Sequence, residues 1–286
     1  MALLKEIKGR LQSVHSTRKI TSAMMMVSSA KLLKTQQLIA TLYPYEQKLN
    51  HMMQHLLQGE MEFRSPYIQQ RDVKRVAIVV FSSNTGLAGR FNHNIINQLN
   101  SVIESYKHLG KENILIYPIG SKVTKAIQKL EMVPAGDYEA IAAKASYQAT
   151  RMIAQELMQL FITDKIDRVE LIYHHYVSKG TQEVRQEIFL PVDLPSGGNE
   201  DPEQEYLVEP DRISLLEQLL PKVIQLKLYT MHIDSLTSEH AARMTAMQIA
   251  NDNADNLIDE LKLEYNKVRQ QSITNELLDI AGGTVR

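Results

Sequence analysis

Two glycines, Gly86 and Gly89, follow an apolar run at 75–81, which is where nucleotide-binding proteins carry a phosphate-binding turn. A dinucleotide fingerprint needs a third glycine, and a P-loop needs Lys followed by Ser or Thr. Neither pattern is present. We therefore expect a structural strand-to-helix turn, with no cofactor and no nucleotide bound.

Histidine pairs are the other residues whose spacing could support chemistry. His51 and His55 stand four apart, but Met52 occupies the place of the glutamate in a zinc-protease motif. His174 and His175 are adjacent in a strand-like run, so they face opposite sides of it and cannot chelate one metal together. The chain has no Cys, which excludes thiol catalysis and Cys-ligated metals. We expect no catalytic residue and no metal site.

Composition narrows the partner classes. Of 286 residues 44% are hydrophobic and 23% charged, and the net charge is −1, so no basic excess favours nucleic acid. The most basic segment, residues 1–58, has no interleaved aromatics. No apolar run reaches the ~20 residues of a membrane helix, and the N-terminus lacks a signal-peptide core. We expect a cytosolic-side protein that does not insert into a membrane.

Residues 1–58 form the first of three unlike segments and are predicted to be one helix. A seam at heptad spacing from Leu4 to Leu56 is apolar at eleven of its sixteen positions, as in a coiled coil. Its polar members Arg18, Thr21, Ser28 and Thr35 lie in the middle, and Pro44 should kink or loosen the helix.

Residues 211–286 are predicted to form a second long helix. Asp211 is the expected N-cap, and a seam from Leu219 to Val268 is mostly apolar. Pro221 lies inside the pattern: it either kinks the helix or marks its start, since proline suits a first turn.

The stretch between them, about 70–205, alternates strand and helix patterns. Strands are expected at 75–81, 113–119, 169–177 and 182–190, the last two joined by a hairpin turn. Helices are expected at 92–107, 121–130 and 139–162, and an exposed acidic loop at 191–205. This order implies a partly parallel sheet with helices on its faces.

The two terminal helices can bury their seams in each other only if they run antiparallel. Residues 1–58 carry a net charge of +6 and residues 209–286 a net charge of −4, which favours that pairing. At 1.5 Å per residue the helices span roughly 80 and 110 Å. The C-terminal helix should therefore extend past its partner, leaving apolar residues near 273–285 for another protein to cover.

Four sequence blocks resemble the gamma subunit family of F-type ATP synthases. They are residues 17–32 (TRKITSAMMMVSSAKL), 83–92 (SNTGLAGRFN), 241–247 (AARMTAM) with 251–254 (NDNA), and 273–283 (ITNELLDIAGG). The blocks occur in the family's order and cover nearly the whole chain. The resemblance implies an antiparallel two-helix coiled coil formed by the N- and C-terminal segments, with an inserted Rossmann-like α/β domain.

By the same resemblance, the chain would be the non-catalytic central shaft of a proton-translocating ATP synthase at the cytoplasmic face of the cell membrane. It would transmit rotation between a membrane rotor ring of c subunits and a catalytic head of alpha and beta subunits, with a small epsilon subunit on its base. Head contacts would fall on Arg269, Gln270, Thr274, Glu276 and Met24. Rotor-ring contacts would fall on Tyr206 and Glu209.

Two other function classes remain open from the residues. A self-associating coiled-coil scaffold would satisfy its seams by homodimerisation, and a nucleotide-binding enzyme would use the α/β domain. Each surface residue singled out also has a plain structural interpretation as a solvated helix charge or a helix-entry loop.

Overall fold

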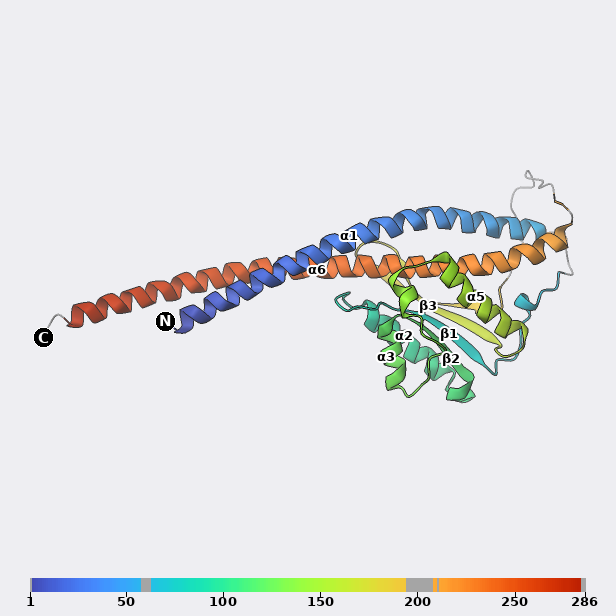
Figure 1. The fold of residues 1–286 in the computed structure, drawn as a ribbon, viewed down its shortest axis with the longest axis horizontal. Coiled ribbons are helices and arrows are strands. Elements are labelled where there is room, and N and C mark those ends of the chain that lie inside the picture. Colours follow the sequence, from blue (N-terminus) through green and yellow to red (C-terminus); the bar gives the residue numbers. More distant parts are fainter. Residues whose placement is uncertain (1, 58–62, 194–207, 210, 284–286) are drawn as a thin grey trace. The chain divides into compact units, whose positions relative to one another are not determined.

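The computed structural model describes residues 2–57, 63–193, 208–209 and 211–283 (Figure 1). It contains two units, one formed by residues 1–30 with 243–286 and one by residues 31–242. Both division points fall inside long helices. The segments expected from the sequence, 1–58, 70–205 and 211–286, follow the boundaries of helices and of the α/β domain. The two units instead group residues that pack together, so each long helix is shared between them.

The two long helices are present. Helix α1 spans Ala2–Leu57 and helix α6 spans Arg212–Gly283. Helix α1 continues through Pro44, which lies on its exposed side, where the carbonyl that loses its N–H partner can be hydrated. Helix α6 begins nine residues before Pro221, so the alternative start at Pro221 is wrong. Asp211 caps α6 as predicted: it accepts from the Ser214 N–H (2.8 Å) and hydroxyl (2.7 Å).

The predicted seam of α1 is its buried stripe. Every buried residue in the described part of α1 belongs to that seam: Ile7, Ser28, Leu32, Thr35, Glu46, Met53 and Leu56.

Helix α6 is buried in two different ways. Within the unit of residues 31–242, nearly all of 223–241 is buried around the whole helix. Within the other unit the buried residues in the described part of α6 are Arg243, at the boundary between the units, and one stripe at heptad spacing, namely Met247, Asn251, Ala254, Ile258 and Leu261. A stripe of that kind requires only one partner helix, whereas burial on all sides requires cover from several elements.

The α/β domain contains one four-stranded sheet in the order β2-β1-β3-β4. Strands β1 (Val76–Phe81), β2 (Ile114–Ile119) and β3 (Arg168–Tyr176) are parallel, and β4 (Gln182–Leu190) is antiparallel to β3. Val76 pairs with Ile114 on one side and with Arg168 on the other. The partly parallel sheet and its hairpin are confirmed.

Helices cover both faces of this sheet. Helices α2 (Phe91–Ser105) and α3 (Ser121–Lys129) pack on the face of Ile78 and Val80. Helix α5 (Tyr147–Ile162) and the nearby part of α6 pack on the face of Ala77 and Val79. Short 3-10 helices lie at Pro66–Ile68, Lys107–Leu109 and Lys111–Asn113.

One expected helix is wrong in detail. Instead of a single helix over 139–162, the chain forms α4 (Glu139–Ala143) and then α5. Lys144 and Ser146 have extended backbone angles, which interrupt the helix. Ser146 is the N-cap residue of α5, although its side chain makes no capping hydrogen bond.

Candidate partner-binding surfaces

The C-terminal part of α6 extends past α1 within their shared unit (Figure 1). Arg18 Nε lies 2.6 Å from Asp255 Oδ1, and the Thr21 hydroxyl donates to Asn251. This antiparallel register reaches the start of α1 near Gln270. The predicted overhang is confirmed, and we call the exposed α6 residues 269–278 the overhang.

The overhang exposes large apolar side chains. Ile273 is 44% exposed, Leu277 62% and Leu278 64%. Grouped apolar side chains on a protein surface are typical of an interaction site. The α1 seam ends before this point, so α1 cannot cover them.

The four polar residues expected to contact a head lie on both sides of that apolar strip. At about 100° per residue, Arg269 and Glu276 share one face of α6, and Gln270 and Thr274 share another. Ile273 and Leu277 fall between these two pairs. The structure therefore brings all four together around one half of the helix.

Local contacts on the overhang are few. The Thr274 hydroxyl donates to the Gln270 carbonyl at 2.9 Å, and the Ser272 hydroxyl donates to Glu276 Oε1 at 3.3 Å. All four candidate side chains are exposed. Arg269 and Glu276 offer opposite charges, and Gln270 offers an amide, so the overhang can bind a polar loop that also carries apolar groups.

The other candidates have different settings. Met24 is half-buried on α1, and the neighbouring Met25 sulfur accepts from the Asn251 amide at 3.8 Å. Glu209 is exposed just before the Asp211 cap. Tyr206 lies outside the described residues.

The glycine turn after β1 uses its polar groups internally. Asn84 Oδ1 accepts from the Ser121 N–H at the start of α3 (2.9 Å), and Asn84 Nδ2 donates to the Glu139 carbonyl (2.8 Å). The Ser83 N–H donates to Asn92 Oδ1 at 3.1 Å. A phosphate bound at the start of α3 would have to displace the Asn84 side chain, which favours the structural interpretation of the turn.

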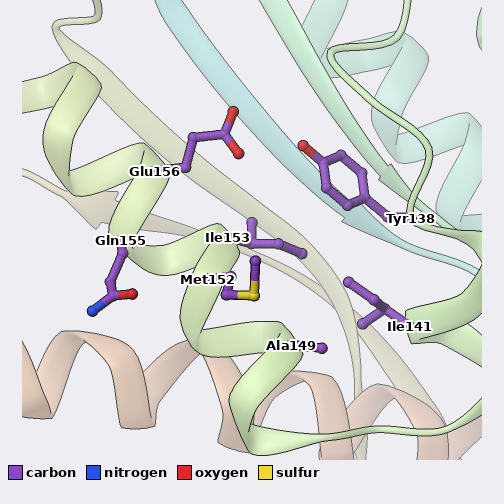
Figure 2. Close-up of a pocket in the computed structure, with 7 residues that line it drawn as sticks. All are labelled: Tyr138, Ile141, Ala149, Met152, Ile153, Gln155 and Glu156. Atoms are coloured by element: carbon purple, nitrogen blue, oxygen red, sulfur yellow. The ribbon is translucent and has the colours of Figure 1, made fainter.

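A cavity of 430 Å³ lies beside α4 and α5 (Figure 2). Its polar lining includes Glu156, which accepts from the Tyr117 hydroxyl at 3.0 Å, and Tyr138. Burial, together with Glu156, raises the pKa of Tyr138 to about 12. The remaining lining residues are uncharged: Ile141, Ala149, Met152, Ile153 and Gln155. This set contains no cation to bind a phosphate.

The two adjacent histidines of β3 do face opposite sides, as predicted. His174 is 1% exposed and stacks on Phe91 of α2, with ring centroids 4.1 Å apart. Burial lowers the pKa of His174 to about 4. His175 faces α6, where its Nδ1 lies 2.7 Å from Asp234 Oδ2. Among the residues that the structure describes, no group of three or more His, Asp or Glu is arranged to hold a metal.

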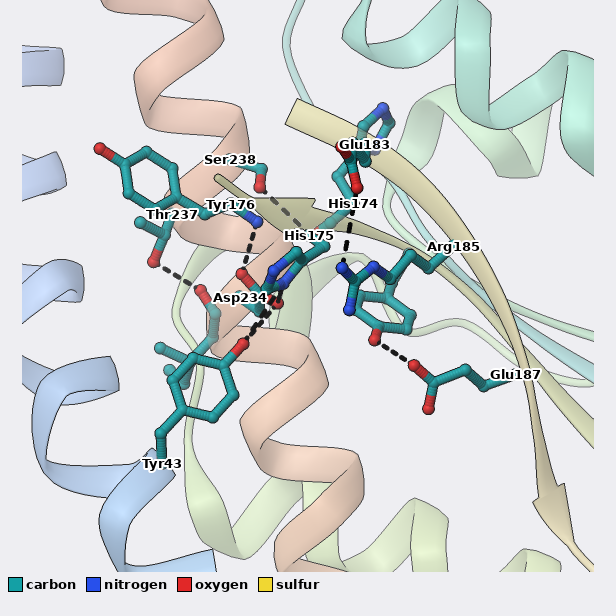
Figure 3. A network of polar contacts seen from close by, with 12 residues as sticks. Tyr43, His174, His175, Tyr176, Glu183, Arg185, Glu187, Asp234, Thr237 and Ser238 are labelled. Atoms are coloured by element: carbon teal, nitrogen blue, oxygen red, sulfur yellow. Dashed lines mark hydrogen bonds and ion pairs between the residues drawn. The ribbon is translucent and has the colours of Figure 1, made fainter. Parts of the chain in front are cut away.

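Asp234 is the centre of a polar cluster that sequence reasoning missed (Figure 3). It is fully buried, and its Oδ2 accepts from the Tyr43 hydroxyl of α1 at 2.7 Å as well as from His175. Its Oδ1 accepts from the Tyr176 N–H of β3 at 2.8 Å. We call Asp234, Tyr43, His175 and Tyr176 the Asp234 junction. The one feature of the sequence that could have pointed to this junction is the acidic Asp234 within a stretch of α6 whose neighbours are mostly apolar or uncharged.

No helix in the described ranges is both long and apolar enough to cross a membrane.

Comparisons with known proteins agree along the full length. The profile of a family described as "ATP synthase" matches residues 3–285. The ATP synthase gamma chains of Phocaeicola vulgatus and Bacteroides fragilis (strain ATCC 25285) are each 50% identical to this chain, over 288 and 289 residues, with 100% of both chains covered in each case.

Solved structures share the fold. A chain of the Euglena gracilis mitochondrial ATP synthase (OSCP/F1/c-ring, rotational state 3) matches with a TM-score of 0.64 at 18% identity, covering 99% of this chain and 94% of that one. A chain of the Tetrahymena thermophila central stalk/c-ring structure matches with a TM-score of 0.57 at 18% identity, covering 81% and 99%. With the coiled coil, the inserted α/β domain and half of all residues shared with curated gamma chains, this chain belongs to the ATP synthase gamma chain family, the central-stalk subunits of F-type ATP synthases.

Proposed function

We propose that this chain is the non-catalytic rotor shaft that couples proton flow through a membrane rotor ring of c subunits to ATP synthesis and hydrolysis in a catalytic head. The alpha and beta subunits of the head would surround the overhang, and an epsilon subunit would bind the α/β domain. The whole assembly would hold the chain at the cytoplasmic face of the membrane as a peripheral subunit, without membrane insertion.

The observation that carries this proposal is the overhang. An exposed helix with an apolar strip between two polar pairs needs a partner, and α1 ends too early to be one. Because the strip covers only one half of the helix, it would present different contacts to each head subunit as it turns. A ligand or partner shifts an equilibrium only by its differential contacts with the states, so one asymmetric face can bias each subunit in turn.

Head contacts are assigned to Arg269, Gln270, Thr274 and Glu276 on the overhang and to Met24 on α1. Met24 is partly exposed, and methionine adapts its shape to changing neighbours. Rotor-ring contacts are assigned to Tyr206 and Glu209. The exposure of Glu209, two residues before the Asp211 cap, supports a contact there.

Rotation tests the proposal directly. The chain is assembled with the head subunits of its own ATP synthase, a bead is attached to the α/β domain, and ATP is added. We expect stepwise rotation in one direction, at a rate that falls with ATP concentration. Assembly of an active head without this chain bound, or a bound chain that does not turn, contradicts the proposal.

The two other function classes are distinguished by the isolated chain. Sedimentation of a monomer excludes the self-associating scaffold, whereas a stable homodimer would support it. Micromolar affinity for a nucleotide would support the enzyme alternative.

A further inference from the structure

Helix α1 makes two polar links within the unit of residues 31–242, one to Asp234 of α6 and one directly to strand β3. The Tyr43 hydroxyl donates to Asp234, which also binds β3 through His175 and the Tyr176 N–H (Figure 3). One face of α1 carries the second link as well, since Gln36 lies two turns before Tyr43. Gln36 Nε2 donates to the Tyr176 hydroxyl at 2.7 Å. The first link therefore reaches β3 through Asp234, at His175 and Tyr176, and the second ends on Tyr176 itself.

These links are directional, whereas most of the α1 packing in this unit is not. Three of its five buried seam residues, Leu32, Met53 and Leu56, are apolar, and apolar burial fixes which face of the helix is buried but not its exact rotation. Of the two polar ones, Glu46 hydrogen-bonds Thr230 of α6 and not the sheet. Hydrogen bonds require a donor–acceptor distance near 2.7–3.2 Å and a nearly straight angle. Turning α1 against the sheet would therefore break both links before it exposed much apolar surface.

The junction is built to keep these bonds. Asp234 is fully buried, and the three donors that reach its two oxygens come from α1 and β3, so water does not compete for it. Burial and the nearby Asp234 carboxylate raise the pKa of Tyr43 far above its usual range, so the hydroxyl remains a donor. Stability alone does not require a buried charge, because well-packed apolar residues often replace one without loss.

We propose that Tyr43 and Gln36 are positioning residues that lock α1 to the α/β domain through the Asp234 junction, so that torque enters both helices of the shaft and not α6 alone. This inference rests on the proposed function. It adds to that function a named mechanical joint, formed by residues outside all the partner contacts assigned above.

The test removes both links and leaves Asp234 with two donors. The variant is Tyr43→Phe with Gln36→Leu. The matched control is Tyr45→Phe with Gln37→Leu, because both of those side chains are exposed on the same helix. Each is assembled with the head subunits, and the angular variance of a probe on the α/β domain is recorded while the rotor pauses.

Without the links α1 carries less of the load, so the variance of the thermal motion should rise. Two equal helices in parallel are twice as stiff as one, and the Arg18–Asp255 and Thr21–Asn251 contacts still join α1 to α6, so about twofold is the upper limit of the rise. ATP turnover and assembly should stay at the level of the control. An angular variance equal to that of the wild type in the Tyr43→Phe, Gln36→Leu variant overturns the inference. If the variance is unchanged and only the melting temperature falls, the two residues have a merely structural role, which also overturns it.

A milder variant keeps the test decisive if the double variant does not assemble. Tyr43→Phe alone should raise the variance by a smaller amount, and no rise overturns the inference. If the wild-type chain itself does not rotate, the proposed function fails. That outcome is distinct from one in which the wild type rotates but removal of the links leaves the angular variance unchanged, which overturns only this inference.

Discussion

At the scale of residues, the overhang and the buried histidines show how different settings give polar side chains different roles. Arg269 and Gln270 are exposed and make no compact cluster, so their effect on function depends on a partner. His174 and His232 are buried and neutral, so their effect is on stability.

We expect Arg269→Ala or Gln270→Ala to lower ATP turnover of the assembled complex about tenfold while the shaft still assembles. A hydrogen bond to a charged group contributes ~1.5–3 kcal/mol, and 1.4 kcal/mol corresponds to a tenfold rate change. The matched control is Asn275→Ala, on the opposite face of the overhang. Turnover at the wild-type rate in both variants would show that these side chains are only solvated.

We expect the free energy of unfolding to fall as the pH falls from about 6.5 to about 4. Burial lowers the pKa of both His174 and His232 to about 4, so the unfolded chain binds protons in this range and the folded chain does not. The contribution of the two neutral histidines to the free energy of unfolding is therefore fully present above pH 6.5. At pH 5 the free energy of unfolding is lower by about 2 kcal/mol for each histidine.

Urea titrations at pH 7.5 and pH 5 measure this change, and His174→Phe isolates one histidine. Phenylalanine keeps the stacking on Phe91 but cannot titrate. The pH-dependent loss in the variant should be smaller by about 2 kcal/mol. An unchanged pH dependence contradicts the assignment to His174.

At the scale of elements, a polar pair between α1 and α6 fixes how the two helices are aligned along their length. Apolar seam residues alone would allow several alignments. The Thr21 hydroxyl donates to Asn251, which is buried among apolar seam neighbours such as Met247 and Ala254. A polar residue at one seam position specifies register at a cost in stability. Variants of Thr21 and Asn251 can therefore measure the cost in stability separately from the effect on register.

We expect Thr21→Val alone to lower the free energy of unfolding by about 1 kcal/mol, because Asn251 loses its donor inside the seam. Adding Asn251→Leu should restore that loss or more, since both polar partners are then replaced by apolar groups. Thermal denaturation of the two variants and the wild type measures the cycle. A double variant less stable than Thr21→Val would contradict the argument.

Glu209, which precedes α6, is assigned to a different partner. We expect Glu209→Lys to weaken proton pumping in vesicles while ATP hydrolysis by the soluble head complex survives, because only the assigned ring contact is reversed in charge. Glu131→Lys, at another exposed glutamate, is the control. Normal pumping by the Glu209 variant would remove this residue from the ring contact.

At the scale of the whole molecule, the chain has an α/β domain of a kind that often binds nucleotides, yet its turn is used for internal bonds. Asn84 occupies the N–H at the start of α3, and the turn lacks the third glycine of a dinucleotide site. Fold alone therefore does not assign a nucleotide to this chain.

We expect the isolated chain to show no measurable affinity for ATP or NAD in a calorimetric titration at micromolar protein. Heat release that fits a micromolar dissociation constant would contradict this, and it would support the enzyme alternative. Asn84→Ala, which frees the Ser121 N–H, would then be expected to change that affinity.

The sequence by itself determined the features that repeat. Seam residues of α1, the heptad stripe 247–261 of α6 and the alternation of strands with helices follow from local periodicity, and periodicity is visible in one chain. The overhang followed from unequal helix lengths. The resemblance of the sequence to the gamma subunit family suggested which residues contact partners, and no periodic pattern could have indicated them.

Only the tertiary structure decided the features that join distant residues. Thr230 and Thr237 are polar residues in a stretch of α6 that is buried on all sides, and their hydroxyls donate to the carbonyls of Leu226 and Ile233 one turn earlier. The Asp234 junction joins Tyr43, His175 and Tyr176 from two other elements, and contacts across 58–191 positions leave no spacing in the sequence. The break between α4 and α5 was also missed, because Lys144 and Ala145 have no strong preference against helix and packing decided the backbone.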